Sequence, residues 1–424
     1  MTTGSAWQTR DVIHWGILGC GDVTEVKSGP GFQKSEGSRL VAVMRRNAEL
    51  AQDYARRHAV PKWYSDAEAL IRDPEVDAVY IATPPGSHLE YALRVAAAGK
   101  PAHVEKPMAR NITECDQMVE AFARARLPLF VAYYRRAQPR FLRAKELIET
   151  MLGRVTAIRY QFTDPRHITT DPARALAEAI RPAAPTNVVV DEKNHRIHFQ
   201  VAAKDIAAVI GPGGEKARQL SRQLGYMLDI QRATEQAPAN HSAGALPWRL
   251  EAENAGGGFF LDLGSHTLDL LDFFFGPLED VAGHAANLAS PYAVEDTLAM
   301  NFRTTAGVPG TAAWNFAGAA REDFFQITGT NGRLTFSTFG QEPLRLELAG
   351  GATQEFPFTP PPHVAQPLVQ AVVNDLRGLG PCSSTGESAR RTTRVMDRVL
   401  DTYYGGRTDA FWTRAQHWPG RRAD

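Results

Sequence analysis

The chain has 424 residues, and at roughly 150 residues per domain this length predicts two or three domains. Hydrophobic residues make up 43% and charged residues 22%, which are ordinary values for a globular protein and exclude wholesale disorder. The 47 basic and 47 acidic residues balance, so no overall field draws the chain to nucleic acid or to an anionic membrane.

Cysteine usage and the N-terminal residues narrow the class of protein further. Cys20, Cys115 and Cys382 are far apart and form no CxxC pair, so the pattern predicts neither a disulfide framework nor a thiolate zinc site. The first residues lack the basic and apolar regions of a signal peptide, and the apolar stretch at 258–276 carries charged residues. We therefore expect a cytoplasmic protein with no membrane contact.

The first predicted strand, residues 12–18, leads into a glycine-rich turn. The turn has a GxGxxT pattern, which permits a tight bend and lets backbone N–H groups approach a pyrophosphate at a helix N-terminus. The pattern alone is a weak signal, because Thr24 stands where a third small residue is usual. The predicted cofactor-binding residues of the turn are Gly19, Cys20, Gly21, Asp22, Val23 and Thr24.

Strands and helices alternate after this turn. Such alternation is typical of a doubly wound parallel sheet, in which the glycines stand where a dinucleotide fold needs them. The further predicted strands are 39–44, 77–82, 101–104 and 128–132, and the predicted helices are 47–58, 65–72, 87–98 and 111–125.

The end of the second strand bears on the choice of cofactor. An acidic residue there usually binds the ribose 2′-hydroxyl of NAD, whereas arginine suits the 2′-phosphate of NADP. This chain has Arg45 and Arg46 and no acid at that place, which predicts a preference for NADP over NAD. The alternative is a solvated arginine pair with no ligand.

Two later strands end in residues that suit a ligand site, because ligands bind at the carboxyl ends of strands in open sheets. The predicted strand at 77–82 ends in a turn, and we expect Thr83, Pro84 and His88 of this turn to contact the cofactor. The next ends in Glu105 and Lys106, and a lysine near the nicotinamide can donate or relay a proton. A plain surface lysine is the alternative.

A glycine triplet at 256–258 precedes a helix with an unusual set of polar residues. Asp262, His266 and Asp269 are spaced i, i+4, i+7, which predicts that they share one helix face. A carboxylate one turn from an imidazole can orient the ring and raise its basicity for proton transfer. The pair could equally be a structural hydrogen bond or part of a metal site, although no third ligand with suitable spacing is near. The triplet favours a ligand, since glycine lets backbone approach closely.

Residues 280–350 contain short alternating runs that predict antiparallel strands, with Asn331-Gly332 as a hairpin turn. One face of this sheet is expected to pack on the helix that carries His266. The last helix is predicted to begin in the capping-box pattern at 384–387.

These parts together resemble the Gfo/Idh/MocA oxidoreductases. The motifs GCGDVT at 19–24, EKP at 105–107 and GGGFFLDLGSHTLD at 256–269 carry the resemblance, which covers residues 12–165 and 246–404. It implies an α/β protein with an N-terminal Rossmann domain over 1–135. A C-terminal α/β domain with an open, mostly antiparallel sheet would follow over 136–168 and 240–424. The last helix of this domain is expected to return to the first domain.

The resemblance also implies an activity: hydride transfer between a nicotinamide and a hydroxyl-bearing carbon of a sugar, polyol or related molecule. Lys106 would then lie beside the substrate hydroxyl, His266 would exchange its proton, and Asp262 would hold substrate and histidine in place. The outer face of the sheet would mediate assembly into a homo-oligomer. The residues expected to contact substrate are Tyr134, Arg135, Trp248, Arg249 and Asp269.

The segment 171–235 interrupts this resemblance and has a pattern of its own. Helices are predicted at 171–181, 204–211 and 215–225, and strands at 187–191, 196–201 and 226–232. This α-β-β-α-α-β order, with a GxxG loop between two helices, resembles a type II KH domain, above all the second KH module of the NusA transcription factor. The parts that match are DPARALAEAIRPA, VVVDEKNHRI, IGPGGEKARQL and GYMLDI.

KH modules clamp single-stranded nucleic acid over the GxxG loop, which here is Gly211, Pro212, Gly213 and Gly214. Proline removes a backbone donor, and nine Lys/Arg against eight Asp/Glu give the segment a net charge of only +1. We therefore expect weak RNA binding at most, because affinity rests on neutralising phosphates. We also expect the segment to slow or gate entry to the substrate pocket.

Two other interpretations stay open. The chain could bind RNA through this module on a catalytically idle oxidoreductase scaffold, or the fold could persist while the insertion disables catalysis. The near-neutral segment and the intact Lys106, Asp262 and His266 favour the enzyme.

Overall fold

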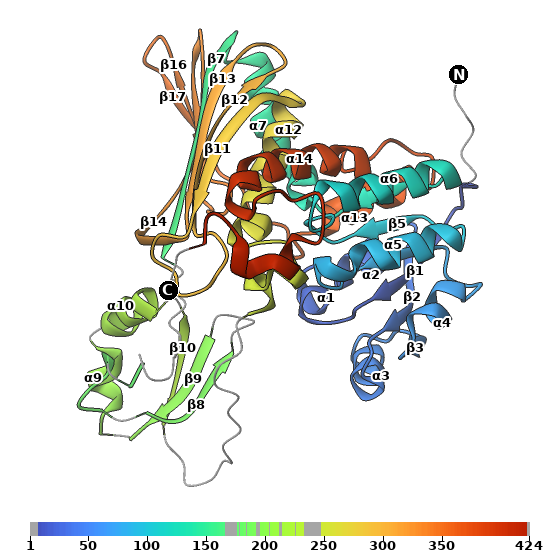
Figure 1. Ribbon diagram of the computed structural model, residues 1–424, viewed down its shortest axis with the longest axis horizontal. Coiled ribbons are helices and arrows are strands. Elements are labelled where there is room, and N and C mark those ends of the chain that lie inside the picture. Colours follow the sequence, from blue (N-terminus) through green and yellow to red (C-terminus); the bar gives the residue numbers. More distant parts are fainter. Residues whose placement is uncertain are drawn as a thin grey trace.

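The computed structural model describes residues 7–165, 176–177, 179–183, 185–191, 196–202, 204–211, 214–224, 226–232 and 247–421. Three β-sheets organise these residues (Figure 1). The six-stranded and eight-stranded sheets lie at opposite ends of the main body, with helices between them, and the three-stranded sheet forms a separate lobe. Among the described residues no helix is long and apolar enough to cross a bilayer.

The six-stranded sheet is parallel throughout and has the order β3-β2-β1-β4-β5-β6. Its strands are β1 (Ile13–Leu18), β2 (Ser38–Met44), β3 (Lys62–Tyr64), β4 (Ala78–Ile81), β5 (Ala102–Val104) and β6 (Leu129–Val131). The order reverses between β1 and β4, which is where a doubly wound sheet opens a crevice for a dinucleotide. The predicted Rossmann fold is confirmed, although the short strand β3 was not predicted.

Helices cover both faces of this sheet: α1 (Asp22–Val26), α2 (Gly29–Lys34), α3 (Ala48–Arg57), α4 (Ala67–Arg72), α5 (His88–Ala97) and α6 (Ile112–Ala125). The helix after the glycine turn is broken, because α1 has only five residues and ends at Lys27 and Ser28 before α2 begins. Gly29, Pro30 and Gly31 open the second piece, and proline there fits a first helical turn but not a helix interior. This break sets the position of Lys27, as shown below.

The eight-stranded sheet has the order β11-β12-β13-β7-β14-β15-β16-β17, and every neighbouring pair except β13–β7 is antiparallel. Its strands are β7 (Val155–Pro165), β11 (Leu278–Ala286), β12 (Thr297–Thr304), β13 (Pro309–Asn315), β14 (Ala317–Gly329), β15 (Gly332–Phe336), β16 (Leu344–Leu348) and β17 (Thr353–Phe356). The mostly antiparallel sheet is confirmed. The predicted turn at Asn331-Gly332 is wrong by one residue, because Gly332 already pairs with Gly329.

The remaining helices join the two sheets: α7 (Pro139–Thr150), α11 (Ala252–Ala255), α12 (Ser265–Phe275), α13 (Gln366–Leu376) and α14 (Gly386–Tyr404). Leu268 and Leu271 of α12 lie in one buried cluster with Trp314 and Phe325 of the large sheet, as expected. Helix α13 instead adds Leu368 and neighbouring residues to the core around β1. The C-terminal part thus returns to the six-stranded sheet, and α14 begins in a capping box at Thr385.

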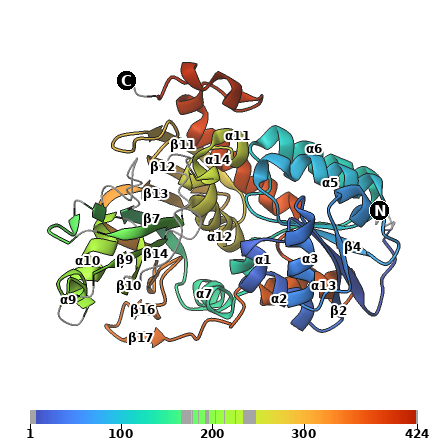
Figure 2. The ribbon, with the colours of Figure 1, turned by 90° about the horizontal axis from the view of Figure 1, so that it is seen from below.

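The third sheet, β10-β9-β8, belongs to the segment with the separate sequence pattern. It comprises β8 (Thr186–Asp191), β9 (Arg196–Val201) and β10 (Met227–Arg232), with helices α9 (Ile206–Ile210) and α10 (Glu215–Leu224). Its core is its own and includes Ile197, Phe199, Val209 and Leu220. The lobe lies beyond the end of the large sheet, away from the six-stranded sheet (Figures 1 and 2). The predicted strands and the two later helices agree within two residues, whereas the first part of the predicted helix at 171–181, residues 171–175, lies outside the described residues.

Candidate active site

The glycine turn follows β1 as expected. Gly19 has φ of +88°, and a Cβ there would come within 2.7 Å of Thr83, so only glycine fits this close approach. Gly21 precedes α1, and a Cβ there would meet no protein atom closer than 3.9 Å. The open space beside Gly21, at the start of a helix, fits a pyrophosphate.

The contacts of Thr24 explain why a threonine stands where the pattern usually has a third small residue. Its hydroxyl accepts a hydrogen bond from Gly21 N at 3.0 Å and donates one to Gly21 O at 2.7 Å. The side chain is fully buried, so it closes the turn instead of facing a ligand. Asp22 is exposed and Val23 half-buried on the same turn.

Cys20 is buried, and burial raises the pKa of its thiol to about 11, so the thiol is neutral. Arg45 lies near enough to oppose this rise, which places its guanidinium close to the glycine turn. Arg45 is half-buried and Arg46 exposed, just beyond the end of β2. The arginine pair is therefore located where the adenosine ribose of a dinucleotide would lie.

His88 begins α5 and is completely buried. Its Nε2 lies 2.7 Å from Thr83 O, and its Nδ1 lies 3.2 Å from the carbonyl oxygens of Pro107 and Met108. Burial lowers the pKa of His88, so the ring stays neutral. His88 thus ties the Thr83–Pro84 turn to the turn after Lys106, and the structure does not place it where a cofactor would touch it.

Lys106 forms the link between the two sheets. Its Nζ donates to the backbone oxygen of Asp262 at 3.0 Å and is paired with the Asp262 carboxylate. Burial lowers the pKa of Lys106, which eases proton exchange at this amine. Glu105 lies behind it, nearly buried, and accepts hydrogen bonds from the Tyr80 hydroxyl and from Lys106 N.

The helix that carries Asp262 is not a regular α-helix. Residues Phe260–Gly264 form a π-helical turn directly before α12. The i, i+4, i+7 argument assumes 3.6 residues per turn, and the wider turn breaks that register. Asp262 faces Lys106 and also lies 3.4 Å from Arg249 Nε.

Asp269 lies elsewhere and corrects two expectations. It is 1% exposed, and its carboxylate accepts Arg136 Nε at 2.8 and 2.9 Å. A carboxylate that is buried and already bound to arginine is not placed to contact substrate. Asp269 is therefore separated from the pocket and does not share the surface of Asp262.

His266 is buried among aromatic rings, and its Nδ1 has no hydrogen-bond partner among the residues that the structure describes. The rings of Tyr134, Tyr133 and Phe339 meet it edge-on, at centroid distances of 5.2, 6.0 and 6.1 Å. Burial, reinforced by the charges of Arg135, Lys106 and Lys27, lowers the pKa of His266 well below its ordinary value. The imidazole is thus neutral at pH 7 and close to Lys106. Its buried Nδ1 is available for a hydrogen bond with a ligand.

Lys27 is a site residue that the sequence argument missed. It follows α1 at the helix break, and its Nζ lies 4.8 Å from the centre of the Tyr134 ring. Tyr134 and Arg135 begin a 3₁₀ turn after β6, and Arg135 Nη1 donates to the Tyr134 hydroxyl at 2.8 Å. The glycine–proline–glycine run at 29–31 was the signal that a helix break would leave Lys27 at the pocket.

Two family models match this chain. The first, described as an oxidoreductase family with an NAD-binding Rossmann fold, matches residues 13–133, and a Gfo/Idh/MocA C-terminal domain matches residues 216–335. Oxidoreductase P35 of Formosa agariphila is 31% identical over 393 residues, which cover 92% of this chain and 99% of that protein. The chain belongs to the Gfo/Idh/MocA family. The resemblance in the sequence is thereby confirmed for the oxidoreductase body.

Other Gfo/Idh/MocA relatives and solved structures support the same fold. A 1,5-anhydro-D-fructose reductase of Ensifer adhaerens is 26% identical and covers 88% of this chain and 91% of its own length. A levoglucosan dehydrogenase in complex with NADH and levoglucosan superposes with a TM-score of 0.67 at 19% identity, over 92% of this chain and 96% of its own. The second family match begins at residue 216, inside α10, so it gives no support to an insertion that ends at 235.

The glycine triplet of this family member serves packing. Gly256 has φ of +87°, and a Cβ there would meet the backbone of Arg110 at 2.8 Å. A Cβ on Gly258 would lie 2.5 Å from Glu295 O. The expectation that the triplet makes room for a ligand is therefore wrong, because protein backbone fills that room. Trp248 is half-buried nearby, and the Arg249 guanidinium lies 4.6 Å from its ring.

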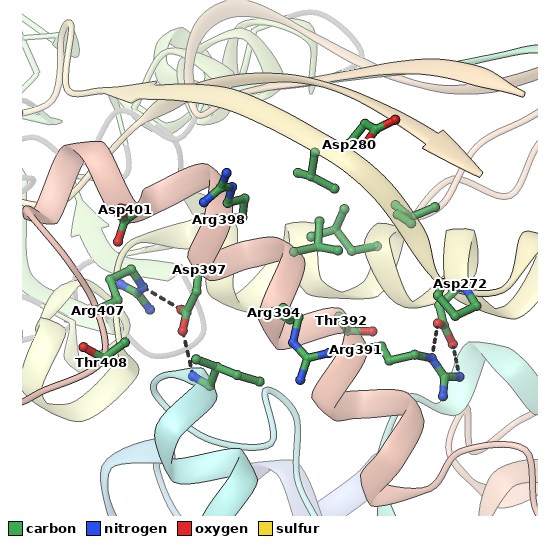
Figure 3. Close-up of a pocket in the computed structure, with 16 residues that line it drawn as sticks. Asp272, Asp280, Arg391, Thr392, Arg394, Asp397, Arg398, Asp401, Arg407 and Thr408 are labelled. Carbon is green, nitrogen blue, oxygen red and sulfur yellow. Dashed lines mark hydrogen bonds and ion pairs between the residues drawn. The ribbon is translucent and has the colours of Figure 1, made fainter. Parts of the chain in front are cut away.

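A cavity of about 630 Å³ lies elsewhere in the Gfo/Idh/MocA fold, between α12, α14 and β11 (Figure 3). Ion pairs line it, Asp272 with Arg391 and Asp397 with Arg407. None of Lys106, Asp262 or His266 borders it. Within the described ranges no group of three or more His, Cys, Asp or Glu residues is arranged to hold a metal ion.

Proposed function

We propose that this oxidoreductase transfers hydride between a nicotinamide cofactor and a hydroxyl-bearing carbon of a sugar, polyol or related small molecule. The observation that carries the proposal is the contact of Lys106, which follows β5, with Asp262 of the π-helical turn, 156 residues later in the chain, beside His266 of α12. Relatives named as a 1,5-anhydro-D-fructose reductase and a levoglucosan dehydrogenase act on molecules of this kind.

The residues present fit a dinucleotide. Gly21 leaves open space at the start of α1, Gly19 allows the tight turn, and Arg45 borders it. Bound there, a nicotinamide cofactor supplies the hydride acceptor or donor. We propose Gly19, Cys20, Gly21, Asp22, Val23, Thr83, Pro84 and Glu105 as the surroundings of the cofactor, with Thr24 and His88 holding their turns in place.

The side chains divide the remaining work. In the oxidation direction, the neutral imidazole of His266 accepts the proton of the substrate hydroxyl. Lys106 donates a hydrogen bond to that oxygen and stabilises the negative charge that develops on it. Asp262 holds the Lys106 amine through two contacts and leaves part of its carboxylate exposed for a substrate hydroxyl. Tyr134, Trp248 and Arg249 complete the substrate pocket.

The direct test is reduction of NADP with a panel of sugars and polyols, followed by absorbance of the reduced nicotinamide. Turnover with at least one panel member supports the proposal. Failure to bind either NADPH or NADH contradicts it, because then the glycine turn is not a working site.

We further propose that NADP is preferred over NAD through Arg45 and Arg46. Replacing Arg45 by Ala should weaken NADPH binding about tenfold and NADH binding less than twofold, because only NADPH carries the 2′-phosphate. Arg39→Ala is the matched control, since Arg39 is exposed at the opposite end of the same strand. Titrations followed by nicotinamide fluorescence measure both; equal affinities of the unmodified protein for the two cofactors would overturn the preference.

We also propose that the chain divides near residue 135, and that 171–235 is an inserted KH-like module. The β-β-α-α-β order of its described elements, the separate core and the placement of Gly211 and Gly214 between α9 and α10, both at positive φ, support this. Pro212 and Gly213 of the loop lie outside the described residues. The near-neutral charge argues for weak binding of single-stranded RNA at most.

Deletion of 171–235 tests the module. We expect faster substrate entry, seen as a lower KM. The intact chain should bind a single-stranded RNA oligonucleotide with a Kd of about 100 µM at best, so the deletion should remove little RNA affinity. Unchanged turnover and KM would remove the gating proposal. Self-association through the outer face of the large sheet is proposed on family resemblance, and analytical ultracentrifugation measures it.

A further inference from the structure

Lys27 has no role in the reaction just described. It is half-buried at the break between α1 and α2, and within the described part of the chain no carboxylate lies at ion-pair distance from it. Its amine lies over the face of Tyr134, which itself packs edge-on against His266. A lysine held over an aromatic ring beside the proposed proton acceptor is directed into the pocket.

The charges that act on His266 are all positive. Beyond burial, Arg135, Lys106 and Lys27 lower its pKa, and within the described ranges no carboxylate raises it. Tyr134 shows the same excess: burial would raise the pKa of its hydroxyl, but Arg135, Lys27 and Lys106 together hold it below the ordinary value. A buried phenol with a lowered pKa requires a locally positive potential.

The nearby carboxylates are already engaged. Asp262 is shared by Lys106 and Arg249. Glu105 accepts from the Tyr80 hydroxyl, and although burial opposes its charge, Lys27 and Lys106 hold the pKa of Glu105 below its ordinary value. Asp323, which acts on Arg135, accepts the backbone N–H groups of Thr338 and Phe339 at 3.0 and 2.6 Å. These three carboxylates face the four cations Lys27, Lys106, Arg135 and Arg249, so one positive charge remains unmatched around Tyr134 and His266.

The proposed site of the cofactor's phosphates is a different one. The pyrophosphate fits beside Gly21, at the start of α1, whereas Lys27 lies at the other end of that helix. An oxidised nicotinamide carries a further positive charge. A neutral substrate would therefore leave one of these cations without an anionic partner in a half-buried pocket.

We propose that the substrate carries an anionic group, bound between Lys27, Tyr134 and Arg135 beside His266. The inference rests on the proposed function and narrows its substrate class to sugar or polyol derivatives with an acidic group. A carboxylate and a phosphate share the chemistry that this site recognises, namely oxygen atoms that accept hydrogen bonds from an ammonium, a phenol and a guanidinium.

Binding to the protein saturated with NADPH, followed by nicotinamide fluorescence, tests the proposal. The probes are D-glucuronate, D-galacturonate, D-gluconate and D-glucose 6-phosphate, against D-glucose, D-galactose and D-sorbitol. We expect the tightest probe to be anionic and to bind about tenfold or more tightly than its neutral counterpart. The advantage should shrink between 0.05 and 0.5 M salt. If one of the sugar acids binds most tightly, the group bound at this site is a carboxylate. If D-glucose 6-phosphate binds most tightly, the group is a phosphate.

Variants of Lys27 locate the effect. Lys27→Met should reduce the ratio of anionic to neutral affinity to about threefold or less, and Lys27→Arg should restore most of it. Lys34→Met, on the exposed end of α2, is the matched control and should leave the ratio unchanged. Equal binding of acids and neutral sugars, or an unchanged ratio in Lys27→Met, overturns the anionic substrate.

The two proposals fail in different ways. Turnover of a neutral polyol with no preference for acids would overturn the anionic group and leave the hydride-transfer function standing. Absence of NADPH binding would overturn the function itself. Binding of no probe at all to the NADPH complex would overturn the anion site.

Discussion

Asp262 and Asp269 lie seven residues apart on one continuous helical stretch, and both carboxylates meet cations. Asp269 lies in a matched and buried set of charges: Arg136 bridges it to Asp272, which the partly exposed Arg391 also binds. The Asp262 side chain is 23% exposed, and its partners Lys106 and Arg249 approach from two directions.

The difference shows what each cluster is for. Arg136, Asp269 and Asp272 satisfy one another in the core, which joins the turn after β6 to α12. The cluster around Asp262 instead combines a half-open carboxylate, a lysine with a lowered pKa and a histidine with an unpaired nitrogen. A saturated network stabilises the fold, and an unsaturated one is left for a ligand to complete.

The largest expected effect is on turnover. Lys106→Met should reduce kcat by about 100-fold to 10,000-fold, because it removes the donor to the substrate oxygen. The fold should persist, since Asp262 keeps Arg249. Lys62→Met, which removes a lysine paired with Asp73 at the far edge of the Rossmann sheet, is the control and should retain full kcat. Substantial activity in Lys106→Met would show that the Lys106–Asp262 pair is structural.

The second effect concerns stability. Arg136→Met leaves two buried carboxylates without their shared partner and should lower the free energy of unfolding by about 3–5 kcal/mol. The matched change Arg249→Met, at the other carboxylate, removes a partly exposed partner and should lower it far less. Chemical denaturation of both variants measures this. Similar losses in the two would erase the distinction drawn above.

The smallest effect is on pH dependence. An imidazole must be neutral to accept the hydroxyl proton, and the pKa of His266 lies well below 6.5. The neutral form therefore already dominates at pH 6.5, where an ordinary histidine would be half protonated. We expect kcat/KM for oxidation to stay constant from pH 8 down to 6.5 and to decrease only at a pH below 6.5. A midpoint at 6.5 or above that disappears in His266→Asn would contradict this environment for the ring.

Much of the architecture could be predicted because it follows local patterns. Alternating apolar runs gave the Rossmann strands, and the short motifs at 105–107 and 256–269 brought Lys106, Asp262 and His266 together. The partner of Asp269 could not be predicted, because Arg136 comes from a turn 133 residues earlier in the chain. Lys27 reaches the pocket only because the first helix breaks, and the glycine triplet packs against backbone that the sequence does not place.

The π-helical turn at 260–264 has a consequence for the history of this site. It holds one residue more than an α-helical turn between the same ends. Deleting a single residue there would restore an α-helix and rotate the preceding segment by about 100°, which would carry Asp262 away from Lys106. The number of residues in this stretch therefore fixes the site as firmly as their identity. A relative with a one-residue gap at this point has a rearranged pocket even where each aligned side chain is the same.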